Sequence, residues 1–386
     1  MLIISSTRDC RRYGLTVLEV VVALVLIPLL ILAMVVLFRW VGDRVNQGRA
    51  EREARDRIRQ AQLQLQRDLD GITAPTTPLD PQAGTGYVEL LEGPDRSLNR
   101  AAAVRAQSVA QCDVDDVLLF TSRSHDVPFE GQMGISLQSH LAEIVWWVDA
   151  KTNHLHRRVL LIRPDLNQSK TGKLPFHSSA TSVEDLAKFY RQNDLSVRLH
   201  AKRGLVANSL ADLNRREHRF GHDPGTFPHV MPELYPGAIP AASWPPFLVP
   251  LGGGRTGDDL ILENVKDFDL RVFDPEAELR GSSDRVLLPG DEQYLATQQV
   301  IGTGAYVDLN YSRSANSAEL SHFHGPCAVQ SGLRQPKWPA LYDTWAKPYD
   351  VPPPYAAPLR GLRIKMILSD QQRTHQATVT AEFVTR

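Results

Sequence analysis

Residues 20–38 form a run of nineteen amino acids without a charge or a hydrogen-bonding side chain. As an α-helix this run rises about 28 Å, close to the ~30 Å thickness of the hydrocarbon core of a bilayer. A secretory signal peptide has a shorter apolar core, about 7–15 residues, followed by a cleavage site of small residues. The run has neither feature, and it therefore predicts one membrane-spanning helix over about residues 15–40.

The charges beside the run predict its orientation. Arg8, Arg11 and Arg12 precede it, and Asp9 offsets one of them. Because basic flanks stay on the cytoplasmic side of a membrane, we expect the bulk of the chain on the other side. The residues after the run are typical of an anchor at the membrane interface: Arg39, Trp40 and Arg44.

An acid and a glycine go beyond what a plain anchor requires. Glu19 directly precedes the apolar run. A carboxylate in such a place costs roughly 2.5–3.5 kcal/mol, so we expect it to be protonated or to have a cationic partner. Gly14 lies five positions earlier, directly after a basic patch. The spacing of this glycine and this acid is the most specific motif in the chain.

Residues 11–19, RRYGLTVLE, followed by the apolar run, resemble the N-terminus of the type IV pilin and pseudopilin superfamily. The resemblance implies that a prepilin peptidase in the membrane cuts between Gly14 and Leu15 and methylates the new N-terminus. Glu19 then becomes the fifth residue of the mature chain, where it neutralises the N-terminal amine of a neighbouring subunit. Opposite charges a few ångströms apart attract strongly in a low dielectric. The alternative is an uncleaved signal anchor in which Gly14 and Glu19 occur by chance.

The pattern remains helical beyond the apolar run, to about Asp70. Gly71 and Pro75 then provide a stop signal. A helix of that extent is about 84 Å long, and we expect Gly42 and Gly48 to loosen it. One apolar stripe follows its second half and predicts the face that holds a globular head: Ala54, Ile58, Ala61, Leu65 and Leu69.

Downstream of the helix, short alternating or apolar segments separated by turns predict β-strands. The expected strands are 116–122, 142–149, 154–162, 259–263, 268–274, 298–309, 361–369 and 375–384. The second and third are expected to form one hairpin, and the last two another. The predicted fold class is α+β and pilin-like, with the long helix packed on an antiparallel sheet. The expected division is a leader over 1–14, the helix over 15–70, and a β-rich head over 71–386 with an insertion at about 163–257.

Several strand patterns of the head resemble the J-type minor pseudopilins of type II secretion, in an enlarged form. The matching segments are 66–69, 117–121, 144–148, 155–158, 265–271 and 358–364, the last preceded by Trp345. The resemblance implies a non-enzymatic subunit at or near the tip of a pseudopilus, in the inner membrane with its head in the periplasm. It implies as partners other pilin-like subunits, the prepilin peptidase and an inner-membrane assembly platform. Two alternatives stay open: a minor pilin or adhesin of a type IV pilus, and a membrane-anchored periplasmic protein of unknown activity.

The insertion contains two short helix candidates and a proline-rich stretch. Thr181 has the spacing to cap a helix over 182–190, with an acid three residues on. Asn208 is placed to start a second helix, over 209–217. Prolines then crowd residues 222–254, which predicts an extended surface loop or a segment that docks a partner.

Composition and motifs argue against several functions. The formal net charge of −1 removes the electrostatic basis for a nucleic-acid partner. The sequence lacks a phosphate-binding glycine loop, a metalloprotease helix, a Cys-x-x-Cys pair and a Gly-x-Ser-x-Gly elbow. We therefore predict no enzyme, no cofactor and no metal site. Two sets of metal-type ligands are interpreted as surface segments: Asp113, Asp115 and Asp116, and His322, His324 and Cys327.

The cysteines leave one pairing open. Of the three, Cys10 departs with the leader, and Cys112 and Cys327 remain in the exported part. An oxidising periplasm permits a disulfide between them, worth about 4–5 kcal/mol on the chain-entropy model. The alternative is two buried free thiols, because the sequence does not show whether the two Cα atoms approach within about 7 Å.

Overall fold

The chain folds into two compact units, Met1–Ala54 and Arg55–Arg386, in a computed structural model. The residues that the structure describes are 16–75, 84–92, 114, 116–149, 151–168, 182–222, 248, 250–281, 285–289, 291, 294–295, 297–309, 340–344, 358–370 and 373–383. They include an apolar N-terminal helix and antiparallel sheets. The fold class is therefore α+β, as expected from the sequence.

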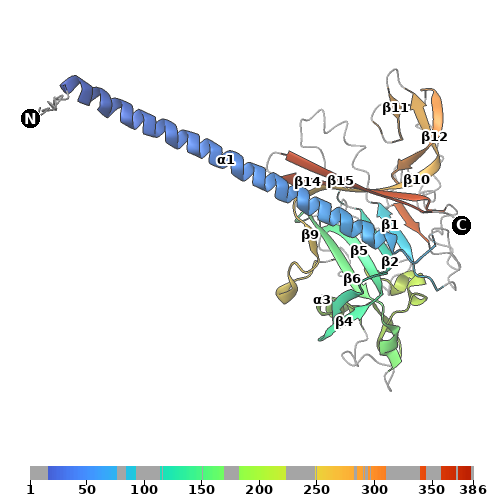
Figure 1. The fold of residues 1–386 in the computed structure, drawn as a ribbon. Helices are drawn as coiled ribbons and strands as arrows, with labels where there is room; N and C mark the ends of the chain where they lie inside the picture. Colours follow the sequence, from blue (N-terminus) through green and yellow to red (C-terminus); the bar gives the residue numbers. More distant parts are fainter. Residues whose placement is uncertain are drawn as a thin grey trace, which may run out of the picture. The chain divides into compact units, whose positions relative to one another are not determined.

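The predicted long helix is present as α1, Val17–Asp70, drawn in blue in Figure 1. It continues without interruption through Gly42 and Gly48, where we expected loosening. An isolated glycine costs a helix only about 1 kcal/mol, which the many flanking helix-forming residues offset. Its first part, Val17–Gly42, has 26 residues, and by length and composition it is able to cross a membrane.

The larger sheet of the second unit has six antiparallel strands in the order β13-β1-β2-β5-β6-β9 (Figure 1). The strands are β1 (Val88–Glu92), β2 (Val117–Arg123), β5 (Leu141–Asp149), β6 (His154–Leu161), β9 (Leu260–Leu262) and β13 (Ala340–Asp343). The predicted hairpin of β5 and β6 is confirmed, with eight residue pairs in register. The sequence analysis missed β1 and β13, which pair with each other across a long separation in the chain.

The second sheet contains the C-terminal strands. It comprises β10 (Val265–Gly281), β11 (Val286–Leu287), β12 (Val300–Val307), β14 (Gly361–Asp370) and β15 (Arg373–Glu382). The predicted hairpin of β14 and β15 is confirmed. Strand β10 extends well past the expected end at Asp274, because a bulge between Asp274 and Glu278 accommodates Pro275 in the strand.

One face of the six-stranded sheet is covered by the C-terminal part of α1. Four residues of the predicted stripe lie in this unit and all are buried: Ile58, Ala61, Leu65 and Leu69. The helix contacts Trp146 on β5 and Arg157 on β6 through Asp68. Because neighbouring residues of a strand point to opposite faces, Trp147 projects from the other side of the sheet.

The insertion covers that other face. Its helix α3 (Val183–Gln192) buries Leu186 and Phe189 in one apolar cluster with Trp147 of the sheet. Two small ribbons flank the region: β3 (Phe129–Gln132) with β4 (Ser136–Ser139), and β7 (Val197–His200) with β8 (Gly204–Ala207). The described part of the insertion up to residue 222 is therefore a packed third layer of the head. Residues 223–247, the core of the proline-rich stretch, lie outside the described residues.

Two local predictions in the insertion are wrong. The cap of α3 is Ser182 and not Thr181, and it forms a reciprocal capping box with Asp185. The expected helix over 209–217 is replaced by two 3₁₀ turns, Asp212–Asn214 and Arg216–His218. The second of these turns contains Arg216, whose side chain is buried.

Candidate functional site

The described end of the predicted processing segment is the first turn of α1. The Thr16 amide donates to Glu19 Oε2 at 2.8 Å, and the Thr16 hydroxyl donates to the same oxygen at 3.0 Å. The Glu19 amide in turn donates to Thr16 Oγ1 at 3.3 Å. These contacts form a capping box, which the sequence analysis did not predict. The T-x-x-E spacing of residues 16–19 is the local signal for it. Gly14 and Leu15 lie outside the described residues.

This geometry gives the Glu19 carboxylate a role in its own chain. Its position in the first turn satisfies the Thr16 amide and complements the positive end of the helix dipole. Both Thr16 and Glu19 are exposed, so the carboxylate is also accessible to a group from another molecule. The acid therefore has local partners, in addition to the neighbouring amine that the pilin resemblance implies.

A buried carboxylate ties α1 to the head. Asp68 is 2% exposed and receives two hydrogen bonds from the Arg157 guanidinium, at 2.7 and 2.8 Å. The Trp146 indole donates to the same carboxylate at 3.0 Å, and the Ser122 hydroxyl donates to the Asp68 carbonyl at 2.8 Å. A bidentate arginine pair of this kind fixes orientation as well as distance. The end of the helix is thus held in a defined position on the sheet.

The insertion is fastened to the opposite face by a cluster of buried ionisable side chains. Glu89 and Asp343 face each other on β1 and β13. Arg219 Nη1 lies 2.8 Å from both carboxylates, and Arg216 Nε donates to Asp343 at 2.9 Å. His222 Nε2 lies 3.1 Å from Glu89. Burial alone raises the pKa of Glu89, but His222, Arg216 and Arg219 outweigh it and hold the pKa below its ordinary value.

A second buried acid, Glu143, lies in the same layer. It accepts hydrogen bonds from the Tyr87 hydroxyl at 2.7 Å, the Ser196 hydroxyl at 2.6 Å and the Phe220 amide at 2.9 Å. Burial raises the pKa of Glu143, and the three donors only partly counteract it. The Arg219 guanidinium lies 3.9 Å from the centroid of the Tyr87 ring, which connects this acid to the charged cluster.

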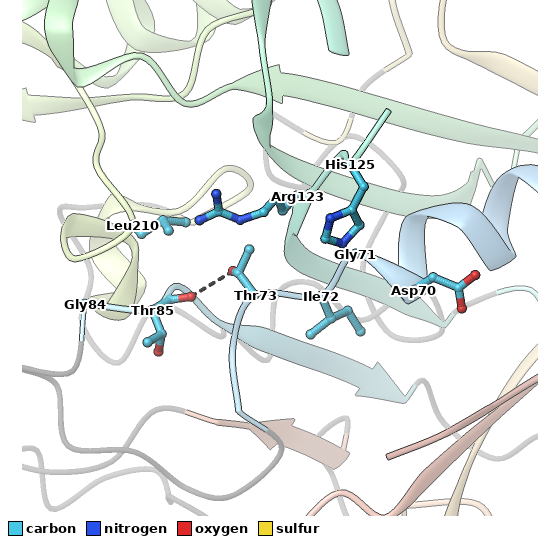
Figure 2. Close-up of a pocket in the computed structure, with 9 residues that line it drawn as sticks. All are labelled: Asp70, Gly71, Ile72, Thr73, Gly84, Thr85, Arg123, His125 and Leu210. Atoms are coloured by element: carbon cyan, nitrogen blue, oxygen red, sulfur yellow. Dashed lines mark hydrogen bonds between the residues drawn. The ribbon is translucent and has the colours of Figure 1, made fainter. Parts of the chain in front are cut away.

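One open pocket of about 410 Å³ lies where α1 ends. Figure 2 shows Arg123 and His125 projecting over the segment that follows the helix. The Thr73 hydroxyl at its floor donates to the Thr85 carbonyl at 2.7 Å and lies 2.6 Å from the Thr121 hydroxyl. The lining residues are Asp70, Gly71, Ile72, Thr73, Gly84, Thr85, Arg123, His125 and Leu210. The pocket lining contains the side chains of Arg123, His125 and Asp70 beside a threonine hydroxyl that is already hydrogen-bonded.

Most other residues singled out from the sequence lie outside the described residues. These are Cys112, Cys327, His322, His324, Asp113 and Asp115. Asp116 is described and buried, and its carboxylate accepts a hydrogen bond from the Leu270 amide at 2.8 Å. Over the part of the chain that the structure describes, no group of three or more histidine, cysteine or acidic side chains is arranged to hold a metal ion.

Comparison of the chain with family models, with curated proteins and with solved structures finds no match. Two features of the chain itself bear most directly on function. One is an exposed apolar helix able to cross a membrane, and the other is a head with a buried charged cluster around Glu89 and Asp343.

Proposed function

We propose that the chain is a non-enzymatic subunit of a pilin-like filament, a minor pseudopilin at or near the tip of a type II secretion pseudopilus. One observation carries the proposal: α1 is a single helix whose two parts have opposite surroundings. None of the residues of Val17–Gly42 whose burial the structure describes is buried by the chain, whereas Ile58, Leu65 and Leu69 belong to the core of the head. A filament subunit requires this division, because its apolar part must remain available to lipid and then to neighbouring helices.

The N-terminal motif supports processing before assembly. In the proposal, prepilin peptidase cuts between Gly14 and Leu15, and Glu19 becomes the fifth residue of the mature chain. The capping box keeps the Glu19 carboxylate at the very start of the helix. In the proposal, the carboxylate there meets the amine of another pilin-like subunit. The subunit would reside in the inner membrane, with its head in the periplasm, and would be assembled by an inner-membrane platform.

The character of the head supports a structural role. Two clusters in it, around Glu89 and around Glu143, are buried and bonded internally. A catalytic group must reach a substrate, whereas these groups hold the insertion to the sheet.

Processing is the property that tests the proposal. The full chain, produced in cells with and without an active prepilin peptidase, should differ by loss of residues 1–14 and by N-methylation of Leu15. Intact mass and N-terminal peptide mass measure both changes. A Gly14→Val variant should remain uncut, whereas the control Gly48→Val, a glycine of α1 with open space around it, should be processed normally.

A further variant separates processing from assembly. Glu19→Ala should be cut and should leave the unfolding of the head unchanged, but it should not enter filaments when crosslinked in membranes. A chain that keeps Met1 in the presence of active peptidase would contradict the proposal outright. Normal assembly of Glu19→Ala would remove this acid from the mechanism.

A further inference from the structure

Three arginines surround the end of the apolar part of α1. Arg39, Arg44 and Arg49 are exposed, and none of them forms an ion pair within the described part of the chain. The segment from Arg39 to Arg49 contains three arginines and one aspartate, a net charge of +2, whereas the whole chain carries −1. Positive charge is therefore concentrated just where the apolar helix ends.

The spacing of these arginines distributes them around the helix. Each follows the previous one by five positions, which turns the side chain by about 140° and raises it by about 7.5 Å. Together they cover the circumference of the helix and not one face of it. A protein partner contacts one face of a helix, whereas lipid headgroups surround it. The pattern favours lipid.

The depth of the three side chains matches a headgroup layer. The apolar span ends at Gly42. The polar interface extends roughly 5–8 Å beyond the hydrocarbon on each side. Arg44 begins about 3 Å beyond Gly42 along the axis, and Arg39 begins about 4.5 Å before it, where a long side chain extends to the interface. Arg49 begins about 10 Å beyond Gly42 and approaches the layer from outside.

The chemistry at this position suits phosphate. A guanidinium group donates two parallel hydrogen bonds to a phosphate, which an ammonium group does not. The Arg44 guanidinium carbon lies 5.2 Å from the centroid of the Trp40 ring, and Trp40 is 58% exposed. Stacking on an indole leaves the N–H edges of the guanidinium open, and tryptophan itself favours the membrane interface.

We propose that Arg39, Arg44 and Arg49 form an arginine collar that selects anionic phospholipid headgroups around the anchor, on the side of the membrane where the head lies. The inference rests on the membrane insertion that is part of the proposed function, and it is independent of filament assembly. Each arginine that reaches a phosphate of an anionic leaflet is expected to contribute about a fivefold preference.

The test uses the full chain reconstituted in phosphatidylcholine vesicles. Spin-labelled phosphatidylglycerol or spin-labelled phosphatidylcholine is added at trace level, and the fraction immobilised by the protein is measured by electron spin resonance. The wild-type chain should immobilise phosphatidylglycerol several-fold more than phosphatidylcholine, and high salt should weaken this preference. The triple variant R39Q/R44Q/R49Q should lose it. The matched control R191Q/R203Q/R215Q removes three exposed arginines of the head and should keep it.

The outcomes are distinguishable. A preference retained in R39Q/R44Q/R49Q, or lost equally in the control variant, would overturn the collar while leaving membrane anchoring intact. A wild-type chain that floats with the vesicles but shows no preference would do the same. A chain that does not float with the vesicles at all would overturn both the collar and the anchor. Replacement of all three by lysine should retain part of the preference, because charge remains while bidentate geometry is lost.

Discussion

The two units of the chain distribute their side chains in opposite ways. In the first unit, large apolar side chains such as Leu24, Ile31 and Phe38 are more than half exposed. In the second unit, the charged groups of Glu89, Arg216 and Asp343 are completely buried. Exposed apolar residues and buried charges are both costly in water, so each arrangement requires compensation.

The compensation comes from different sources. The head provides its own: every acid in the cluster of Glu89 and Asp343 has an arginine within hydrogen-bonding distance. The apolar helix does not, since its described spanning residues are not buried by the chain. It follows that the head should fold as a self-sufficient body, whereas the helix depends on lipid or on other subunits. Three substitutions test this contrast.

The largest effect is expected in the charged cluster of the head. Arg219→Met leaves two carboxylates in a fully buried site with fewer positive partners, which should cost about 3–5 kcal/mol of unfolding free energy. Urea unfolding of the full chain in detergent, followed by the fluorescence of the buried Trp146 and Trp147, measures the loss. The exposed Arg191→Met should change stability by less than about 0.5 kcal/mol. Equal effects of the two variants would show that the buried cluster is not what holds the insertion.

A substitution in the first unit should weaken membrane insertion and leave the stability of the head unchanged. Ile31→Arg places a charge in the middle of the apolar span and should disfavour membrane insertion by about 2.5–3.5 kcal/mol. Vesicle flotation measures this loss, with Ile31→Leu as the control. The urea midpoint of the head should not change. A shifted midpoint would mean that the stability of the head depends on the span, which would break the contrast.

The smallest effect concerns pH. Burial raises the pKa of Glu143 above its ordinary value of 4.5, so its contribution to stability is present at acid pH and is lost as the pH rises through the folded-state pKa. Glu143→Gln removes this titration while keeping an acceptor for Tyr87 and the Phe220 amide. The stability of the variant relative to wild type should therefore increase from about pH 4.5 upward. Urea unfolding at several pH values measures this stability difference, with the exposed Glu184→Gln as control. A stability difference that does not change with pH would refute the raised pKa of Glu143.

Local patterns predicted much of the fold. The length of the apolar run indicates a helix, the stripe of Ile58, Leu65 and Leu69 repeats at helical spacing, and the β5–β6 and β14–β15 hairpins join neighbouring segments. In each case the interacting residues are close in the sequence, so periodicity and turn length suffice to indicate them.

The remaining features depend on residues far apart in the chain. Strand β13 has four residues, too few to show a period, and it is defined by its pairing with β1. The charged side chains of Arg219, Glu89 and Asp343 look like ordinary surface residues until the fold brings them together. The same holds for Asp68, whose partner Arg157 is 89 residues away. The capping box of Thr16 and Glu19 is the exception, because its local spacing carried a usable signal.

The pairing of β1 with β13 also bears on how the protein is made. The Val88 amide bonds to the Thr344 hydroxyl, 256 residues later, so one border of the large sheet is completed only after nearly the whole polypeptide has been synthesised. A chain that emerges N-terminus first must keep this border unoccupied for most of its synthesis or translocation. During that interval the nascent strand is open to wrong partners, and a chaperone that masks it would improve the yield of native protein.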